Sequence, residues 1–313
     1  MSVTWDSWRR LLSWGLLVLG LGAISGCGKP APEVVVYCAQ DQVYAEPILT
    51  AFTAQTGIRV RPLYDSEAVK TVGLANRLMA ERSQPQCDVF WGNEELRTRQ
   101  LVRAGVLASN DWGAFGYRSR RIVVNTNRVA VEAYPRSLTD LTNAVWRGKV
   151  ALGYPLFGTT ATHFAALRQL WGPAAWEQWC RALVANAALV VDGNSVTARL
   201  VAKGEASAGL TDSDDIAAEQ RAGGPVIALP IGPETLLIPN TVALTANAPH
   251  PEAGRRLMAY LRSEEVVSKL MRAGALEGGR SSELANPVLQ PDWQLLVDDL
   301  PATTARLKEV FLR

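Results

Sequence analysis

The chain has 313 residues, of which 48% are apolar and 20% are charged. This length is about twice that of a ~150-residue domain, so it predicts one large or two medium domains. The composition excludes a disordered chain. Thirty-two basic and 30 acidic residues leave a net charge of +2. Because no run of Lys or Arg is long enough for a nucleic-acid patch, we expect no nucleic-acid partner.

The N-terminal segment has the pattern of an export signal. A basic start precedes a short apolar run over residues 11–23, which is followed by Ile24-Ser25-Gly26-Cys27. The run is shorter than the ~20 residues that a membrane span needs. The last four residues resemble the bacterial lipobox, in which the Cys is lipidated and becomes the mature N-terminus. We predict a lipoprotein signal peptide over residues 1–26, lipidation and membrane anchoring at Cys27, and a tether over 27–32. A plain signal peptide or an uncleaved anchor is the alternative.

Strands and helices alternate from residue 33 onward. The expected elements are a strand at 33–38, a helix with Pro47 in its first turn and its end at Gly57, a strand at 58–64, a helix capped by Asp65 or Ser66, a strand at 87–91, a helix at 94–104 and a strand at 121–125. This alternation predicts right-handed crossovers and a mainly parallel sheet.

A second alternating block follows a turn-rich stretch. Its expected elements are a strand at 149–154, helices from Thr159 and Pro173, a strand at 189–191, a short helix ending at Gly204, a strand at 206–210, a helix from 211–213, and strands at 226–231 and 236–244. After Pro249 the pattern is helical, with a last helix at 304–312.

Two such blocks and a helical tail predict two lobes. We expect lobe one to comprise residues 33–125 plus 240–313, and lobe two residues 126–239. The chain crosses between them near 125–127 and 239–241, which are the hinge candidates.

Three cysteines follow the signal segment. Cys38 lies near the end of one expected strand and Cys87 at the start of another. If the two strands are parallel, the thiols lie toward opposite edges of the sheet, too far apart for a disulfide. We predict that these two and Cys180 are small buried residues without a bond.

Polar residues follow the predicted strands where ligands bind in open parallel sheets, outside the carboxyl ends of the strands. Loops of both lobes would meet in a cleft between them. The ligand-binding candidates are Gln40, Glu67, Trp91, Asn93, Thr159, Thr160, Asn194, Ser195, Asp212 and Asp214. Helix capping is the alternative role for the hydroxyl and carboxylate residues, and core packing is the alternative for Trp91.

Catalytic signatures are sparse. The two histidines, His163 and His250, lack metal-ligand spacing, and there is neither a nucleophile elbow nor a glycine-rich phosphate loop. The adjacent Glu94 and Glu95 would point in different directions on a helix. We therefore predict that the protein is not an enzyme, with a secreted enzyme on the same scaffold as the rival class.

Several strings of residues resemble a known family. They are Val36-Tyr37, Thr56-Gly57-Ile58, Asp88-Val89-Phe90-Trp91, Val124-Asn125-Thr126, Trp146-Arg147-Gly148-Lys149-Val150 and Pro239-Asn240-Thr241. Over residues 33–280 the chain resembles extracellular solute-binding proteins, in the ferric-iron and thiamine-like branch of type 2 periplasmic binding proteins. The resemblance implies a two-lobed α/β fold, each lobe a mainly parallel sheet flanked by helices. It also implies a monomeric receptor, in the periplasm or at the cell surface, that delivers a small solute to an ABC permease.

The resemblance also bears on the cargo. Ferric-binding members commonly place a tandem tyrosine pair after the strand predicted at 206–210, but residues 211–215 contain no tyrosine. Glu67 is a counterpart of the acidic ligand in the first lobe, whereas Gln40 or Asp41 stands where some members have histidine. Although this chain lacks the tyrosine pair, the resemblance to the family still implies ferric iron or an iron complex as cargo, and it implies no cofactor. Carboxylate ligation would come from Glu67, Asp212 and Asp214.

Two other cargo classes stay open on the residues themselves. Carboxylates beside Tyr37, Tyr64 and Trp91 would suit an organic cation such as thiamine or a polyamine. The helix N-termini near Thr159 and Ser195 would suit a phosphonate or a phosphorylated solute.

Overall fold

The computed structural model describes residues 32–64, 70–230, 232–279 and 288–312. Residues Glu33–Arg313 form a unit separate from the N-terminal segment. Every helix and strand below belongs to this unit. The predicted signal peptide, Cys27, Glu67 and the cap candidates Asp65 and Ser66 lie outside the described residues.

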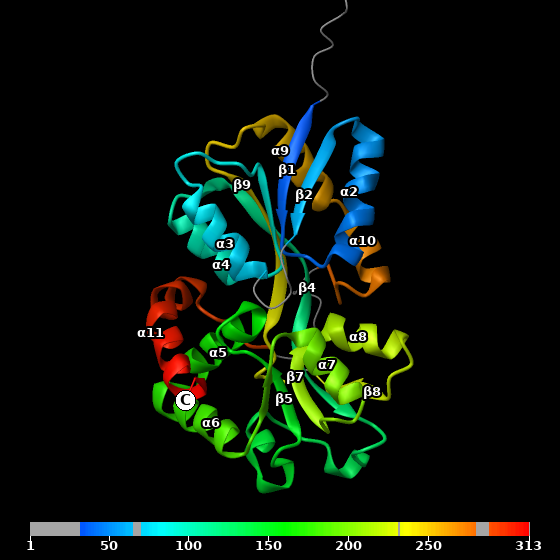
Figure 1. Ribbon diagram of the computed structural model, residues 1–313, viewed down its shortest axis with the longest axis vertical. Coiled ribbons are helices and arrows are strands. Elements are labelled where there is room, and N and C mark those ends of the chain that lie inside the picture. The colour runs from blue at the N-terminus through cyan, green and yellow to red at the C-terminus, as the bar shows by residue number, and fades with distance from the viewer. Residues whose placement is uncertain (1–31, 65–69, 231, 280–287, 313) are drawn as a thin grey trace, which may run out of the picture. The chain divides into compact units, whose positions relative to one another are not determined.

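The first third of this unit alternates strand and helix as the sequence predicts (Figure 1). Its elements are β1 (Glu33–Cys38), α2 (Gln42–Thr56), β2 (Arg59–Tyr64), α3 (Lys70–Ala80), β3 (Val89–Gly92) and α4 (Glu95–Arg103). Helix α2 ends at Gly57, whose φ of 70° allows the left-handed cap. The helix begins five residues before Pro47, so the expected placement of this proline in the first turn is wrong.

The second block also follows the predicted order. Its elements are the 3₁₀ turns η1 (Val131–Ala133), η2 (Thr139–Thr142) and η3 (Ala144–Trp146), then β5 (Val150–Gly153), α5 (Gly158–Trp171), α6 (Pro173–Ala185), β6 (Leu189–Val191), α7 (Asn194–Ala202), β7 (Ala208–Asp212), α8 (Ser213–Arg221) and β8 (Val226–Ala228).

The longest strand is one that the sequence pattern largely hides. Strand β4 spans Leu107–Asn125, whereas only residues 121–125 were expected to be extended. Its partner β9 (Leu237–Thr245) runs antiparallel to it, with register shifts between Leu107 and Trp112 and between Phe115 and Tyr117. Gly116 lies at the second shift with φ 57°, where an added Cβ would meet the Leu276 side chain at 2.4 Å. Such irregular pairing removes the simple alternation that marks a strand in sequence.

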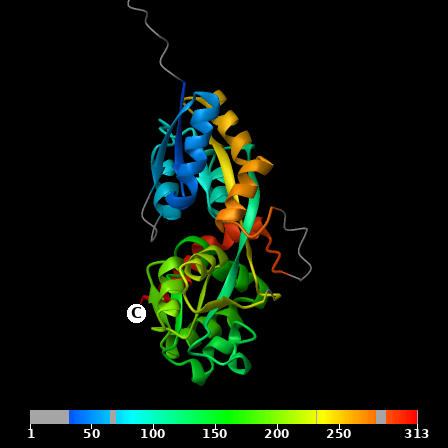
Figure 2. The ribbon, with the colours of Figure 1, turned by 90° about the vertical axis from the view of Figure 1, so that its right-hand side faces the viewer.

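The strands form one path in the order β2-β1-β3-β9-β4-β7-β5-β6, with β8 paired to β4. The strands β1, β2 and β3 pair in parallel, as do β5, β6 and β7, whereas β4 and β9 pair antiparallel with their neighbours. Residues 107–119 of β4 pair with β9, and residues 120–125 pair with β7 and β8. Figures 1 and 2 show β4 running from the β1–β3 end of the sheet to the β5–β7 end. This strand therefore joins the two α/β blocks.

The tail forms α9 (Pro251–Leu261), α10 (Glu264–Ala273) and α11 (Trp293–Phe311), so the last helix is longer than expected. Leu296, Leu300 and Leu307 of α11 share a hydrophobic core with Phe164 and Trp176 of the second block. The sequence predicts that the whole tail belongs to lobe one; in the structure α11 packs on α5 and α6 as well as on α4. The lobe boundaries near residues 125 and 240 stay a prediction.

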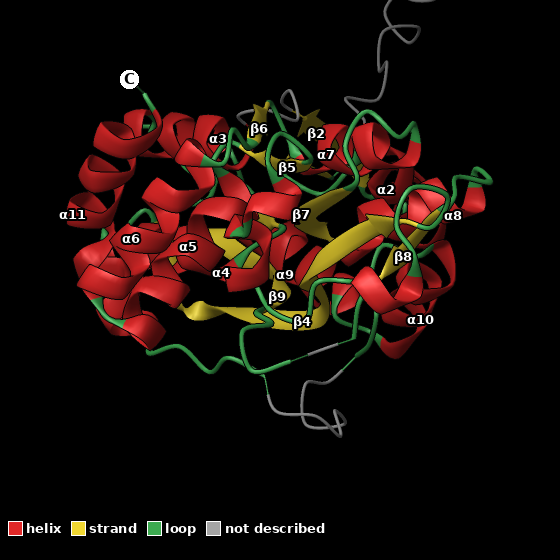
Figure 3. Ribbon diagram, turned by 90° about the horizontal axis from the view of Figure 1, so that it is seen from below, coloured by secondary structure: helices red, strands yellow, loops and turns green. Residues whose placement is uncertain are grey.

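Helices cover both sides of the strands, as Figure 3 shows from below. Both faces of β3 are consequently buried. Cys38, Cys87 and Cys180 are buried, as the sequence predicts, and none of the three forms a disulfide within the described part of the chain. Within the described residues, no helix has both the length and the apolarity to cross a bilayer.

Candidate functional site

The candidate site forms where β7 ends and three helices begin. Asp212 is the last residue of β7, Thr159 and Thr160 lie in the first turn of α5, and Asn194 opens α7. The Thr159 hydroxyl donates to Asp212 Oδ2 at 2.7 Å, and Asn194 Nδ2 donates to Thr159 Oγ1 at 2.8 Å. Thr160 Oγ1 donates to Asn194 Oδ1 at 3.1 Å. The structure thus brings together four of the predicted residues, because parallel strands end at one edge of a sheet.

Two arginines of β4, which sequence reasoning missed, complete this cluster. Arg120 Nη1 donates to Asp212 Oδ1 at 2.7 Å, and Arg118 Nε donates to Asp212 Oδ2 at 3.2 Å. The two arginines are only 1% and 2% exposed, and Asp212 is 3% exposed. Alternate residues of a strand point to the same face, so the spacing of two explains why both guanidinium groups reach one carboxylate. The signal is the Arg118-Ser119-Arg120 pattern, which lies just before the strand expected at 121–125.

The charges of these groups depend on one another. Burial alone would raise the pKa of Asp212, but the charges of Arg120 and Arg118, with hydrogen bonds from Arg120 and Thr159, hold it below its ordinary value. Burial would likewise lower the pKa of Arg118, and Asp214 and Asp212 raise it instead. Asp212 and Arg118 are therefore both charged at neutral pH.

Asp212 accepts hydrogen bonds from four groups. In addition to Arg118, Arg120 and Thr159, Asn194 Nδ2 lies 3.4 Å from Asp212 Oδ2. A carboxylate has about four lone-pair sites. Asp212 would have to give up some of these bonds to hold a metal ion, so its first role in this arrangement is to balance the two arginines.

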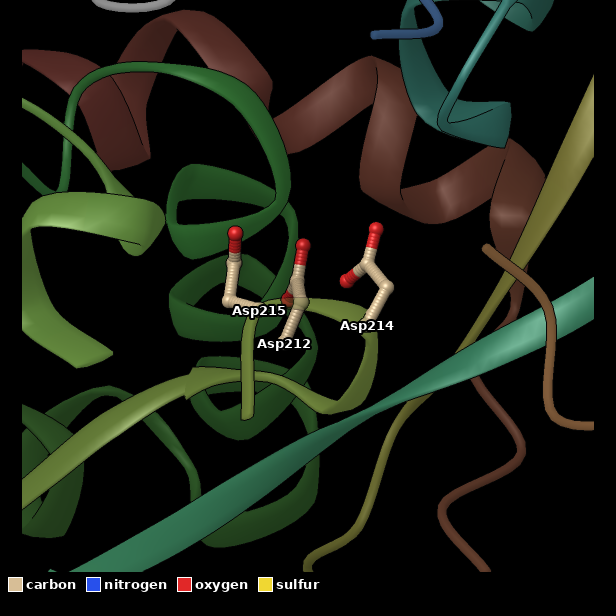
Figure 4. Close-up of side chains that lie close together, drawn as sticks. All are labelled: Asp212, Asp214 and Asp215. Atoms are coloured by element: carbon tan, nitrogen blue, oxygen red, sulfur yellow. The ribbon is translucent and has the colours of Figure 1, made fainter. Parts of the chain in front are cut away.

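The three aspartates of the β7–α8 turn are close neighbours. One carboxylate oxygen each from Asp212, Asp214 and Asp215 lies within 4.8 Å of the others, and Figure 4 shows the three side chains pointing to one side of the turn. Asp214 Oδ1 lies 3.4 Å from Arg118 Nε, and Asp215 Oδ2 accepts from the Thr211 hydroxyl at 3.2 Å. Acidic residues in the first turn of a helix also stabilise its dipole.

A chain of hydrogen bonds links this cluster to the first block. Arg118 Nη1 donates to the Asn93 carbonyl oxygen at 2.8 Å and to Asn240 Oδ1 at 3.2 Å. Asn240 Nδ2 in turn donates to Gln40 Oε1 at 2.9 Å. Gln40 and Asn93, predicted from the ends of β1 and β3, therefore reach the same network through Arg118.

One predicted residue, Trp91, lies apart from this network. Trp91 is completely buried and packs beside Phe115 with ring centroids 6.1 Å apart, so the structure places it in the core rather than at a ligand surface. The physical reason is that helices cover both faces of β3. Tyr37 and Tyr64 also pack against hydrophobic clusters. Ser195 is half-buried in the first turn of α7.

The site is close to balanced in charge. Arg118 and Arg120 face Asp212, Asp214 and Asp215, which leaves one net negative charge. The N-termini of α5, α7 and α8 each contribute up to about half a positive charge. The arrangement therefore suits a ligand that carries both signs of charge, or a metal ion together with an anion.

The joined sheets, the crossing strands β4 and β9, and the polar loops at the strand ends define a type 2 periplasmic binding protein with two lobes. A family model described as bacterial extracellular solute-binding protein matches residues 34–275. The chain belongs to this family, whose members are the substrate-binding components of ABC importers rather than enzymes.

Curated relatives include ferric iron-binding proteins. The major ferric iron-binding protein of Neisseria meningitidis serogroup A is 23% identical over 314 residues, covering 92% of this chain and 93% of the relative. That of Neisseria gonorrhoeae is 25% identical over 211 residues, which is 61% of this chain and 62% of the relative.

Two solved structures illustrate the shared fold. Iron-bound HitA from Pseudomonas aeruginosa has a TM-score of 0.77 at 21% identity and covers 90% of this chain and 99% of its own. AfuA from Actinobacillus pleuropneumoniae, with fructose-6-phosphate bound, has a TM-score of 0.79 at 18% identity with the same coverage of both chains.

Proposed function

We propose that the protein is a lipid-anchored receptor that captures ferric iron together with a small oxyanion, such as citrate, and delivers it to an ABC permease. The mixed charge of the site carries this proposal. Carboxylates of Asp214 and Asp215 are hard oxygen ligands that suit a trivalent cation. The helix N-termini beside them suit the accompanying anion.

The relatives support this choice of cargo. Several are named for ferric iron, and the structure of a Trichodesmium protein with the same fold has iron and citrate ligands. This chain lacks tyrosine at 211–215, so an anion that fills coordination positions would compensate for missing protein ligands. Glu67, outside the described residues, is the proposed contribution of the opposite lobe, and closure of the lobes would complete the site.

Titration with ferric citrate, compared with citrate alone, tests the proposal. We expect ferric citrate to stabilise the purified protein by about 2.7 kcal/mol at 100 times its dissociation constant, whereas citrate alone has little effect. The double substitution Asp214→Asn and Asp215→Asn should lower the affinity for ferric citrate by about tenfold or more for each carboxylate removed. Glu219→Gln, at the other end of α8, is the matched control and should bind normally. Unchanged affinity in the double variant refutes iron capture at this turn.

A sugar phosphate is the second candidate. The convergence of the α5 and α7 N-termini favours it, because backbone N–H groups there attract phosphate. AfuA, which shares the fold, is a fructose-6-phosphate complex. Isothermal titration with fructose 6-phosphate and with inorganic phosphate distinguishes this cargo from iron, since neither contains a metal.

Lipid anchoring at Cys27 is tested separately. We expect metabolic labelling with palmitate to mark the wild-type protein and not Cys27→Ser, which should leave the membrane fraction. Membrane retention of an unlabelled Cys27→Ser protein would instead indicate an uncleaved apolar anchor.

A further inference from the structure

One arginine of the second block reaches a helix of the first. Arg221 lies in the last turn of α8, whose buried Ile216 shares a hydrophobic core with Val123 and Ala151 of the second block. Arg221 Nη2 donates to the Tyr44 hydroxyl of α2 at 3.0 Å. The Tyr44 side chain packs against the hydrophobic core of the first block, which holds the acceptor in place. The hydrogen bond therefore joins two helices that are anchored in different blocks.

The same guanidinium group fills the space beside Gly274. This glycine follows α10 with φ 77°, in the left-handed conformation that glycine adopts at helix ends. A Cβ added there would lie 2.9 Å from Arg221 Cζ and closer still to Nη1. Val266 and Leu270 anchor α10 in the core against which Tyr44 packs. Arg221 therefore lies against two helices of the first block, and the C-terminus of α10 is the negative end of its dipole.

Helix α8 connects this contact to the candidate site. Asp214 and Asp215 lie in its first turn and Arg221 lies in its last, so the two ends are about 10 Å apart at a rise of about 1.5 Å per residue. Burial raises the pKa of Tyr44 against the charge of Arg221, and the charges of Asp214 and Asp41 act in the same direction as burial. The Tyr44 hydroxyl is therefore neutral when it accepts from Arg221.

The contact lies away from the strands that join the lobes. Those strands are β4 and β9, and Arg221, Tyr44 and Gly274 belong to neither. Rotation of one lobe about these strands must therefore separate Arg221 from its contacts. We propose that Arg221 is an interlobe latch, a positioning residue that holds α8 against α2 and α10 and keeps the cleft closed over its solute.

This proposal deepens the proposed function and rests on it only in that the cleft holds a solute. It does not require that the solute is iron. A basic residue in a last turn also stabilises its own helix, and that role alone would leave the separation of the lobes unchanged. The test therefore measures the separation of the lobes without added solute, and the release of ferric citrate independently.

The lobe separation is measured by electron–electron double resonance between two spin labels. They are attached at Thr50→Cys on α2 and Lys203→Cys at the end of α7, two exposed residues of different blocks. The full chain carries Cys27→Ser, and the three cysteines of the described part of the chain are buried. Release is measured by loading the protein with ferric citrate and adding an excess of a hydroxamate chelator.

Three variants disturb the latch from different sides. Arg221→Ala removes the donor, Tyr44→Phe removes only the acceptor hydroxyl, and Gly274→Ala displaces the guanidinium group. Arg199→Ala is the control for the first, since Arg199 is an exposed arginine in the last turn of α7. Gly57→Ala is the control for the last, because Gly57 ends α2 at φ 70° and an added Cβ there would meet nothing within 4 Å.

We expect each of the three variants to lengthen the mean distance between the labels and to release ferric citrate about three- to tenfold faster. Both controls should match the wild type, and Gly274→Ala should add nothing in the Arg221→Ala background, because the three residues form one contact. Label distances that stay unchanged in Arg221→Ala and Tyr44→Phe overturn the latch, as does equal lengthening in the controls. A protein that opens in these variants but never binds ferric citrate supports the latch and refutes only iron as cargo.

Discussion

Replacing Asp212 by asparagine tests the central electrostatic feature of the candidate site. Asp212 is the carboxylate that pairs with both Arg118 and Arg120, and all three residues are almost completely buried. Arg120 also donates to neutral oxygens of Leu210 and Asn194, which cannot replace the lost charge. Removing one partner of a buried ion pair costs about 3–5 kcal/mol, because the remaining charge stays buried.

We therefore expect Asp212→Asn to lower the free energy of unfolding by about 3–5 kcal/mol. For a chain of this size each kcal/mol lowers the melting temperature by about 2–4 °C, so the expected shift is on the order of 6–20 °C. Urea denaturation and calorimetry at pH 7 measure the two quantities. Asp299→Asn is the matched control, since its carboxylate is 47% exposed and pairs with Arg168 at the surface. The free energy of unfolding of Asp299→Asn should fall by less than about 1 kcal/mol.

A double-mutant cycle separates the ion pair from other effects of the substitution. If Asp212 stabilises the fold mainly by balancing Arg120, then Arg120→Met should recover part of the stability that Asp212→Asn loses. The coupling energy should be about 1–3 kcal/mol. Additive losses in the double variant, or a loss in Asp212→Asn no larger than in Asp299→Asn, would refute the reasoning.

Three further predictions concern buried titratable groups. The pKa of His163 falls to about 3 in the folded protein. The contribution of the neutral ring to the free energy of unfolding is therefore complete above about pH 6.5, and about 2 kcal/mol of it is lost at pH 5. Urea melts should show this slope in the wild type and in His250→Gln, and not in His163→Phe. Burial raises the pKa of Glu94, although Arg97 and Thr162 act to lower it. The free energy of unfolding should therefore rise as pH falls through that pKa. Glu94→Gln should not destabilise the protein at pH 7. A loss above about 1 kcal/mol would contradict this. Burial raises the pKa of Cys87 to about 12 and also raises that of Cys180, so both thiols should react with Ellman's reagent only after unfolding.

Local signals were sufficient to predict one half of the site. Thr159, Asn194 and Asp212 each follow a short apolar run, and each stands at the start of a helix. Because these strands are parallel and adjacent, the order of elements alone brings the three residues to one edge. The predicted convergence therefore needed no knowledge of side-chain contacts.

The burial of Trp91 could not be predicted in the same way. Position at a strand end suggests access to a ligand, but access depends on what covers the sheet. Helices from distant parts of the chain cover both faces of β3, and Phe115 of β4 packs beside the indole. A residue at a strand end is exposed only if the elements around it leave that end open.

The charge of the site was the hardest property to infer, because it depends on contacts of long sequence separation. The segment 211–215 by itself looks acidic and suggests a bare cation as cargo. Arg118 and Arg120 lie more than 90 residues earlier in the chain, in β4. The irregular pairing of β4 with β9 just before them, between Phe115 and Tyr117, hides the strand pattern. Once the two arginines are placed, Asp212 is a counter-ion of both arginines, and Asp214 lies 3.4 Å from Arg118 as well. A bare trivalent cation would then face two buried guanidinium groups, so a cation accompanied by an anion fits the site better.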